Sequence, residues 1–349
     1  MEVRKLSLSE WADALPASGY EAFHDPDALS VLEEYAQDAT LRLYGGFKGD
    51  QTRALLPVFV RRLPLGGRIV SSPPPGMHVP HMGPLVMPTS PKQRKREQVN
   101  QRFADGIMED LDLDSRSLLY VICSPSYDDP RPFSWADHSV QVSFTYDLVV
   151  GDDDAETVLK TFSKSRRREI RSGQDLDVAI ERGGLDEVRA IYDQTQDRFS
   201  EQNEYFGLSW AFVRDLYDSL GDRARAYVAR DPDGEFLTGI LSLYSADSGS
   251  YWLGGVRSDY DNISMNTLLH WAIVRDIVED PALESVDRYD MVGAGEYRLS
   301  KYKSKFNPEL RRYYVVNSGG TKMQMAKAAY ETIGIVRSSA VGKGVGSFL

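Results

Sequence analysis

Glu296–Leu310, with the sequence EYRLSKYKSKFNPEL, is the stretch that decides the fold of this chain. It lies between two runs typical of strands, at 289–292 and 313–316. The spacing of its apolar residues predicts a helix with one narrow apolar face, because these residues coincide at about 100° per residue. That face consists of Leu299, Tyr302 and Phe306. This part of the chain therefore alternates strand, helix and strand.

One lysine of this helix, Lys303, does not join the basic residues on its solvated face. It lies about 40° from Leu299 in the same projection, at the border of the apolar face. Its ammonium could therefore enter a partly desolvated cleft. Alternatively, its stem lies along the edge of the core and its charge stays in water. The spacing alone supports both interpretations.

Two motifs give the chain a resemblance to a known family. Tyr302–Asn307, YKSKFN, follows Gly293–Gly295 and resembles the FK-x-x-F-G/N ending of FemAB-type transferases, a branch of the GNAT acyltransferases. Upstream, Ser163–Arg171 resembles the S-K-x-x-R-x-x-I-R signature that opens the second domain in the same family. The resemblance implies an α/β (α+β) fold of tandem GNAT-like domains, each a mixed, mostly antiparallel sheet flanked by helices.

The net charge of −11 argues against a broad nucleic-acid-binding surface, which needs positive faces. Two segments are locally basic, because Lys160–Arg171 and Arg298–Arg312 each hold six basic residues and one acidic residue. Basic islands in an acidic protein are typical of a site for a localised anion, such as the phosphates of a cofactor or of a nucleotide-linked substrate. They are also typical of solvated helix faces.

The composition is that of a globular protein with two domains, since the chain has 349 residues of which 42% are hydrophobic. No apolar run reaches the roughly 18 residues of a membrane span, and the N-terminus lacks a signal-peptide core. We therefore expect a cytoplasmic protein. The single cysteine, Cys123, cannot form an internal disulfide, which fits a reducing compartment.

The segment Gly151–Asp154 is the expected domain boundary. Residues 1–151 would form a degenerate N-terminal GNAT-like domain, and residues 152–318 a C-terminal GNAT acyltransferase domain. Residues 319–349 would form a basic tail, which could make a weak contact with a membrane surface.

Each expected domain contains a hairpin preceded by helical segments, at Leu41–Val60 and at Ala224–Tyr244, which indicates two copies of one unit. Pro57 in the first hairpin would have to lie at an edge or a bulge of its sheet. From residue 177 onward the patterns predict a strand, two helices, three antiparallel strands, a helix, a strand, a helix and a strand. This is the order of elements in GNAT proteins.

A helix is also expected between Gly151 and Gly173, with an aspartate as its N-cap. Helical projection places Arg166 among its apolar positions. The family signature favours Arg167 instead, through its spacing to Ile170. The sequence leaves open which of the two arginines faces a cleft.

The resemblance implies acyl transfer to an amine, which requires an acyl donor held beside the amine and a stabilised oxyanion, and no metal. In the GNAT fold two adjacent strands splay apart and expose main-chain groups to the donor. Here those strands would be Ser250–Val256 and Tyr289–Val292. Gly254 and Gly255 fit a bulge at this opening, because glycine permits close approach of the backbone. Trp252 flanks them as a candidate substrate contact.

GNAT enzymes normally hold the pyrophosphate of coenzyme A with an R/Q-x-x-G-x-G/A loop at a helix N-terminus. The corresponding segment here, RSDYDNISMN, lacks these glycines. Arg257 could still contact a phosphate, and Ser264 and Asn266 could cap the helix. The expected binding residues for an acyl-CoA donor such as acetyl-CoA are these three with Arg167, Gly254 and Gly255. The FemAB branch implies another donor, aminoacyl-tRNA, whose acceptor end the basic segments would suit.

Lys303 is the expected catalytic residue, and it would supply positive charge to the oxyanion or to the donor phosphates. Tyr302 and Phe306 would fix its helix and contact the substrate. Glu296 projects on the same side two turns earlier and is a candidate base. The alternative is that Glu296 is an acidic residue of the first helical turn, favoured there by the helix dipole.

The proline-rich and glycine-rich segment Ser71–Pro91 predicts a long ordered loop, and such loops are often functional. By the resemblance it would line the acceptor side of the cleft, with His78 and His81 as substrate contacts. Two histidines without a further His or Cys nearby are a weak metal signal, so we expect no metal.

The leading hypothesis is an N-acyltransferase that moves an acyl group from acyl-CoA to an amine on a sugar nucleotide, a glycan or a cell-envelope precursor. One alternative is a FemAB-type amino-acid transferase that uses aminoacyl-tRNA. Another is a catalytically degenerate GNAT-fold binding module, because the usual phosphate loop is absent. An open cleft with Lys303 pointing into it would favour an enzyme.

Overall fold

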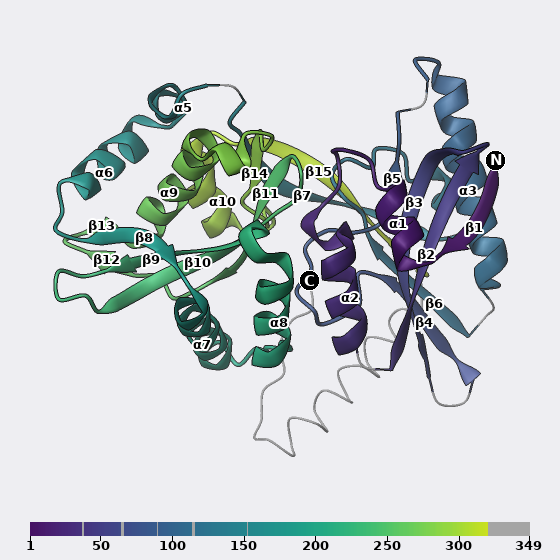
Figure 1. Cartoon of the computed structure of the whole chain (residues 1–349), viewed down its shortest axis with the longest axis horizontal. Coiled ribbons are helices and arrows are strands. Elements are labelled where there is room, and N and C mark those ends of the chain that lie inside the picture. The colour runs from purple at the N-terminus through teal and green to yellow at the C-terminus, as the bar shows by residue number, and fades with distance from the viewer. Residues whose placement is uncertain (37, 64–65, 89, 114–115, 152, 320–349) are drawn as a thin grey trace. The chain divides into compact units, whose positions relative to one another are not determined.

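The computed structural model describes residues 1–36, 38–63, 66–88, 90–113, 116–151 and 153–319. The chain forms two compact units, whose elements are labelled in Figure 1. Unit 1 comprises Met1–Ser143 and the segment that begins at Arg312, and unit 2 comprises Phe144–Arg311. The chain leaves unit 1 within strand β7 (Ser139–Val149) and returns to it within strand β15 (Glu309–Asn317).

Unit 1 is built on a mostly antiparallel sheet. Its strands, in spatial order, are β1 (Glu2–Leu6), β2 (Ala39–Lys48), β3 (Gln51–Arg62), β4 (Arg68–Ser72), β6 (Ser117–Ile122) and the C-terminal part of β15, with β5 (Leu85–Val86) paired to β3. The β4–β6 pair is parallel. The helices that accompany this sheet are α1 (Leu8–Ala14), α2 (Pro26–Tyr35), α3 (Gln93–Leu111) and α4 (Arg131–Trp135).

The hairpin expected at Leu41–Val60 is formed by β2 and β3, but Pro57 lies in the interior of the sheet, opposite Leu43. On the other side of β3, the pairing with β5 covers Ala54–Leu55 and the pairing with β4 covers Phe59–Arg62. Pro57 falls between these two partners. Its missing N–H therefore leaves neither neighbouring strand without a donor.

The strands of unit 2 are also mostly antiparallel. In spatial order, they are the C-terminal part of β7, β14 (Arg288–Asp290), β11 (Ser248–Gly254), β10 (Phe236–Tyr244), β9 (Ala224–Arg230) and β8 (Ala179–Gly183). β11 and β14 are parallel. Helices α7 (Leu185–Glu201) and α8 (Trp210–Leu220) lie on one face and α9 (Met265–Glu279) on the other (Figure 1). The α/β fold class expected from the sequence is confirmed.

The core of unit 2 lies between its sheet and α9. Leu269, Ile273 and Val274 of α9 are fully buried and belong to one cluster with Tyr227 and Tyr289 of the sheet. Burial of aliphatic side chains of this size contributes about 1.5–3 kcal/mol each. α9 is apolar on nearly every side, as expected of a helix enclosed between a sheet and other helices. It therefore provides a rigid base for polar residues at its N-terminus.

The helix expected at Glu296–Leu310 is shorter than predicted. α10 covers Tyr297–Lys303, and a single 3-10 turn follows before β15 begins at Glu309. Asn307 adopts a left-handed conformation, with φ of 57°, which ends helical geometry before Pro308. Leu299, expected on the apolar face, is 38% exposed. No residue of α10 is fully buried, and the buried residue of this segment is Phe306 in the 3-10 turn that follows.

The helix expected between Gly151 and Gly173 is divided in two. α5 covers Ala155–Thr161 and α6 covers Lys164–Gln174. The break arises because the Ser163 hydroxyl accepts a hydrogen bond from the Arg166 N–H at 3.3 Å and so starts a new helix.

The remaining elements of unit 2 include the short hairpin of β12 (Asp259–Tyr260) and β13 (Ile263–Ser264), next to α9. Among the described residues, no helix is long and apolar enough to cross a membrane. The domain limits expected near 151 and 318 stay predictions. Residues 320–349, most of the expected basic tail, lie outside the described residues.

Candidate active site

The parallel strands β11 and β14 separate at their C-terminal ends. They pair only over Ser248–Ser250 and Arg288–Asp290, and β11 then continues to Gly254 while β14 ends. Beyond Ser250 and Asp290 the two backbones no longer pair with each other. This separation of two adjacent strands is the one expected from the sequence, and it lies within unit 2.

The bulge at this opening is at Trp252 and not at the expected pair of glycines. In the pairing of β10 with β11, Leu241 faces Leu253 and Ser242 faces Tyr251, so Trp252 is the extra residue. Its buried ring packs edge-on against Phe212 of α8, at 6.0 Å between centroids. The expected role of Trp252 in substrate binding stays a prediction.

Gly254 and Gly255 are needed for close packing. A Cβ on Gly254 would lie 1.8 Å from the Tyr251 hydroxyl, and one on Gly255 would lie 2.2 Å from Oε1 of Gln194. The Gly254 carbonyl accepts a hydrogen bond from the Thr195 hydroxyl at 3.0 Å. Gly255 therefore lets α7 approach the strand end, and Gly254 leaves room for the Tyr251 side chain. The use of the two glycines in holding a donor stays a prediction.

The chain turns sharply where β14 ends. Val292 has φ of 54° and Gly293 has φ of 65°. A positive φ is a strained conformation for a β-branched residue. Asp290 supports the turn, because its Oδ1 accepts the Val292 N–H at 2.7 Å and the Thr145 hydroxyl at 2.5 Å. The carbonyls of Val292 and Gly293 both accept hydrogen bonds from the ammonium of Lys303.

Lys303 lies at the edge of the apolar core, in agreement with its position at the border of the apolar face in the helical projection. Its side chain is partly buried, and its Nζ lies 3.1 Å from the Gly293 carbonyl. Burial lowers the pKa of Lys303 to about 8, against the opposing influence of Asp290 and Glu296. Of the two interpretations left open by the sequence, the desolvated ammonium is the one observed. Its catalytic role is untested.

Arg166, and not Arg167, is the arginine that points into unit 2. Only 1% of its side chain is exposed, and its guanidinium lies over the rings of Tyr302 and Phe306, 4.5 Å and 4.3 Å from their centroids. Nη2 donates to the Tyr302 carbonyl at 3.1 Å. Nη1 donates to the Thr267 hydroxyl and to Glu169. One side chain thus connects α6, α9 and α10.

Arg167 has a local structural role. Its Nη1 donates to the carbonyls of Lys160 at 2.8 Å and Phe162 at 2.6 Å, at the C-terminal end of α5. These are carbonyls that a helix end leaves without an intrahelical partner. The family signature favoured Arg167 for the cleft, and the structure supports the helical projection, which favoured Arg166.

A carboxylate lies at the N-terminus of α9. Oε1 of Glu169 accepts the Ser264 N–H at 3.4 Å and the Thr267 hydroxyl at 3.3 Å, and its Oε2 lies 2.7 Å from Arg166. The expected caps do not form, because the Ser264 side chain makes no cap hydrogen bond and Asn266 accepts the Ser258 N–H instead.

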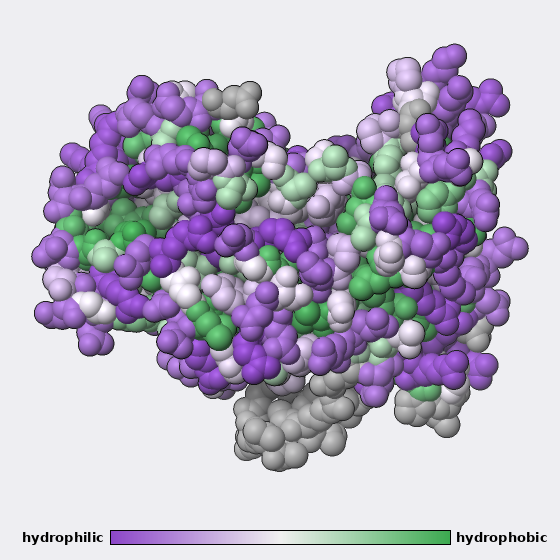
Figure 2. Space-filling model, viewed as in Figure 1, coloured by the Kyte–Doolittle hydropathy of each residue, from purple (hydrophilic) through white to green (hydrophobic). Residues whose placement is uncertain are grey.

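The surroundings of this helix end are tightly packed on the side of α6. A Cβ on Gly173 of α6 would lie 2.4 Å from Leu268, so α6 packs directly on α9. Figure 2 shows apolar surface between α6 and the β12–β13 hairpin, where the partly buried Ile263 lies. Arg257, expected to contact a phosphate, is 77% exposed and pairs with Asp259 at 3.2 Å.

A neutral histidine lies beneath the opening. His270 of α9 is buried among the rings of Tyr251, Tyr302 and Phe306, with its Nδ1 3.2 Å from the Tyr289 hydroxyl. Burial lowers the pKa of His270 to about 3, and the nearby charges of Lys303 and Arg166 lower it further in the same direction. The histidine is therefore uncharged at neutral pH. The contacts of Tyr302 and Phe306 are with Arg166 and His270, and their use in substrate binding stays a prediction.

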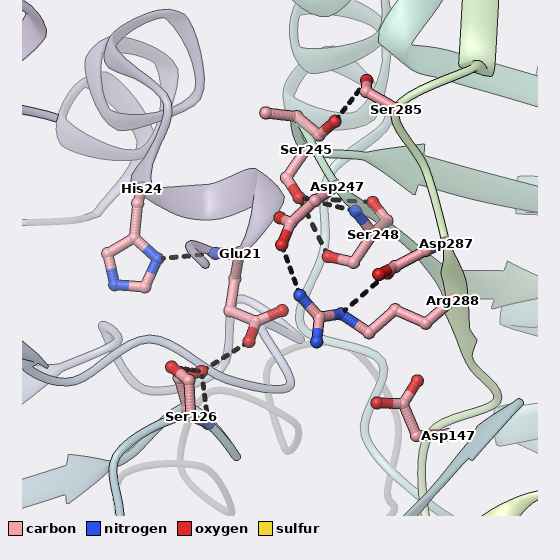
Figure 3. Close-up of polar contacts among 12 residues, drawn as sticks. Glu21, His24, Ser126, Asp147, Ser245, Asp247, Ser248, Ser285, Asp287 and Arg288 are labelled. Atoms are coloured by element: carbon pink, nitrogen blue, oxygen red, sulfur yellow. Dashed lines mark hydrogen bonds and ion pairs between the residues drawn. The ribbon is translucent and has the colours of Figure 1, made fainter. Parts of the chain in front are cut away.

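Two carboxylates face each other across β7 and β14. Asp147 is the register partner of Asp290, and its Oδ2 accepts from Arg311 at 2.7 Å. Oδ1 of Asp147 is buried without a hydrogen-bond partner, and burial with the charge of Asp290 raises the pKa of Asp147. On the same strand Arg288 donates to Asp247 and lies 3.8 Å from Asp287 (Figure 3). The sequence pattern did not identify this acidic pair, because it depends on strand register.

The remaining predicted site residues lie at the exposed start of α10 or in the other unit. Glu296 is exposed at the N-cap position of α10, 3.7 Å from Arg298. In unit 1, His78 is half-buried and His81 is buried edge-on to Tyr313, at 4.5 Å between centroids. No group of His, Cys, Asp and Glu among the described residues has the arrangement of a metal site. The roles of Glu296, His78 and His81 stay predictions.

The family comparison agrees with this geometry. Residues 141–304 match the family model for the acetyltransferase (GNAT) domain. This part of the chain is a GNAT domain. It contains the strand opening, Arg166, Glu169 and Lys303. The match supports an acyltransferase and confirms the resemblance on which the sequence interpretation rested. No curated protein matches the sequence.

Solved structures share the fold over nearly the whole chain. The crystal structure of FemX is similar with a TM-score of 0.63 and 9% identity, covering 90% of this chain and 97% of that one. The C-terminal domain (DUF2156) of a putative lysylphosphatidylglycerol synthetase from Agrobacterium fabrum has a TM-score of 0.53 and 12% identity, covering 92% and 95%. A tandem GNAT protein from the clavulanic acid biosynthesis pathway has a TM-score of 0.51 and 14% identity, covering 92% and 99%.

The depressed pKa of Lys303 predicts a pH-dependent stability. The folded protein releases this proton near pH 8, whereas the unfolded chain holds it up to its ordinary pKa of 10.5. The unfolded state therefore binds more protons between these values, and this group adds to stability as pH rises through that range. Thermal unfolding between pH 7 and pH 10 should show the wild type gaining stability relative to Lys303→Met. The exposed control Lys301→Met should track the wild type, and parallel curves for all three proteins would refute the assignment.

Proposed function

We propose that this protein is an N-acyltransferase that joins an activated acyl group to a primary amine at the opening between β11 and β14. The observation that carries this proposal is the desolvated ammonium of Lys303, held at the end of β14 by the carbonyls of Val292 and Gly293. A positive charge in a water-poor site is the group that a developing oxyanion requires.

In the proposed reaction the acceptor nitrogen attacks the acyl carbonyl carbon, the carbonyl oxygen becomes an oxyanion, and the donor's leaving group departs. Lys303 stabilises the oxyanion with its ammonium. The amine gives up a proton during this step, and Glu296 is the proposed acceptor of it. Glu296 is exposed and close enough to affect the pKa of Lys303, so a proton that it takes can pass on to water.

The proposed acceptor is an amine on a sugar nucleotide, a glycan or a cell-envelope precursor. Support comes from the FemAB-type motifs around Ser163 and Lys303. Unit 1 would be a degenerate GNAT-like domain whose loop with His78 and His81 contributes to acceptor binding. This part of the proposal rests on the family resemblance.

Two donors suit this chemistry, acyl-CoA and aminoacyl-tRNA. GNAT domains typically use acyl-CoA, whose pyrophosphate would lie at the N-terminus of α9. The residues present do not fit a pyrophosphate there, because the glycine loop is missing and Glu169 accepts the Ser264 N–H. This observation favours the second candidate function, transfer of an amino acid from its ester with tRNA.

Replacement of Lys303 by methionine should lower transfer at least about 100-fold, as loss of one oxyanion donor does in other enzymes. Methionine matches the length and shape of the apolar stem, so the fold should be kept. Transfer of labelled acyl or aminoacyl groups to an amine acceptor measures this effect. The exposed control Lys301→Met should keep wild-type activity. Retained activity in Lys303→Met would contradict the role of Lys303 in stabilising the oxyanion.

Thermal unfolding in the presence of each donor separates the two candidate functions, because a ligand that binds only the folded state raises the midpoint. We expect charged tRNA to raise the midpoint and acetyl-CoA to leave it unchanged. A rise with acetyl-CoA alone would assign the donor to coenzyme A. No rise with acetyl-CoA, a longer acyl-CoA or charged tRNA would favour the binding-module alternative.

A further inference from the structure

We propose that Glu169 is a selectivity residue that keeps diphosphates out of the N-terminus of α9, and thereby excludes coenzyme A thioesters as donors. The inference deepens the proposed function and rests on it for the identity of the site. Its own test is a binding measurement that requires no transfer activity.

The first argument is the position of the Glu169 carboxylate. A helix N-terminus binds anions because its first N–H groups have no intrahelical acceptor and the helix dipole is positive there. At α9 the Ser264 N–H is bonded to Oε1 of Glu169 and the Met265 N–H to the Ser258 carbonyl. A side chain of the protein thus occupies the place where this fold would receive a phosphate.

The second argument is the cation beside it. Arg166 is 99% buried by side-chain area, its Nη1 reaches both Glu169 and Thr267, and its Nε is buried without a hydrogen-bond partner. A buried guanidinium needs an anion, because an unpaired buried charge is strongly destabilising. The N-terminus of α9, the Thr267 hydroxyl and the Arg166 guanidinium therefore form an anion site. The carboxylate of Glu169 occupies this site.

The third argument is accessibility. Glu169 is 25% exposed, whereas Arg166 behind it is 1% exposed. The carboxylate therefore stands between solvent and the guanidinium. An incoming diphosphate would meet like charge at the surface of the site before it could reach Arg166 or the N–H groups of α9. Its binding would require Glu169 to give up its hydrogen bonds with Arg166, Ser264 and Thr267.

The test is the affinity for acetyl-CoA and for ADP, measured by calorimetry, in the wild type and in Glu169→Ser. Serine removes the charge and the bulk while leaving Arg166, Thr267 and the helix end in place. We expect Glu169→Ser to bind both ligands at least 10-fold more tightly than the wild type. Adding Thr267→Val to that variant should remove part of the gain, because the hydroxyl would bond the phosphate.

The matched control is Glu156→Ser, which removes the same charge from the neighbouring helix α5, where Glu156 pairs with Arg171 at 2.8 Å. It should bind like the wild type. If Glu169→Ser proves too unstable, Glu169→Gln keeps the shape without the charge, and its affinity should lie between the two.

The proposal is overturned if the wild type already binds acetyl-CoA as tightly as the Glu169 variants, or if Glu156→Ser gains as much. It is also overturned if no Glu169 variant gains affinity. Failure of the proposed function has a different signature, because absence of transfer from any donor would leave the binding difference intact.

Discussion

The buried guanidinium of Arg166 is the interaction on which the arrangement of the site depends. It starts on α6, lies over two rings of the α10 region and reaches the first turn of α9. Removing one partner of such a buried charge is expected to destabilise the folded state by about 3–5 kcal/mol. The contacts of Arg166 therefore hold α6, α9 and α10 in one arrangement. The contacts of the guanidinium with the rings of Tyr302 and Phe306 depend on the orientation of α10 and of the turn that follows it. Lys303, one residue after Tyr302, is thereby placed at the end of β14.

A second constraint comes from the strand end itself. Val292 keeps a strained conformation because Asp290 accepts its N–H, and this turn directs two carbonyls to Lys303. Burial lowers the pKa of Lys303, and the negative charges of Asp290 and Glu296 oppose that shift. A lysine near pH 8 is still mainly protonated at neutral pH, as an oxyanion-stabilising role requires.

Much of the fold follows from local pattern. The β2–β3 and β9–β10 hairpins and the alternating strands of unit 2 follow from short stretches of sequence, and so does the border position of Lys303. The features that the sequence did not predict depend on contacts between distant segments. Glu169 meets Ser264 across nearly a hundred residues, and the bulge at Trp252 depends on how β10 and β11 pair. Neither the Glu169–Ser264 contact nor the bulge produces a periodic pattern in the sequence. Arg166 falls among the apolar positions of the helical projection, in agreement with its burial, whereas the motif favoured Arg167.

The central claim is that Lys303 carries its charge in a water-poor site, and NMR titration of that one ammonium tests it most directly. Lysine residues labelled with ¹⁵N or ¹³C can be followed through the pH range, with Lys303→Met used to assign the signal. The account predicts a midpoint of about 8 for Lys303. A midpoint at the ordinary lysine value of 10.5 would place the ammonium in water and contradict it.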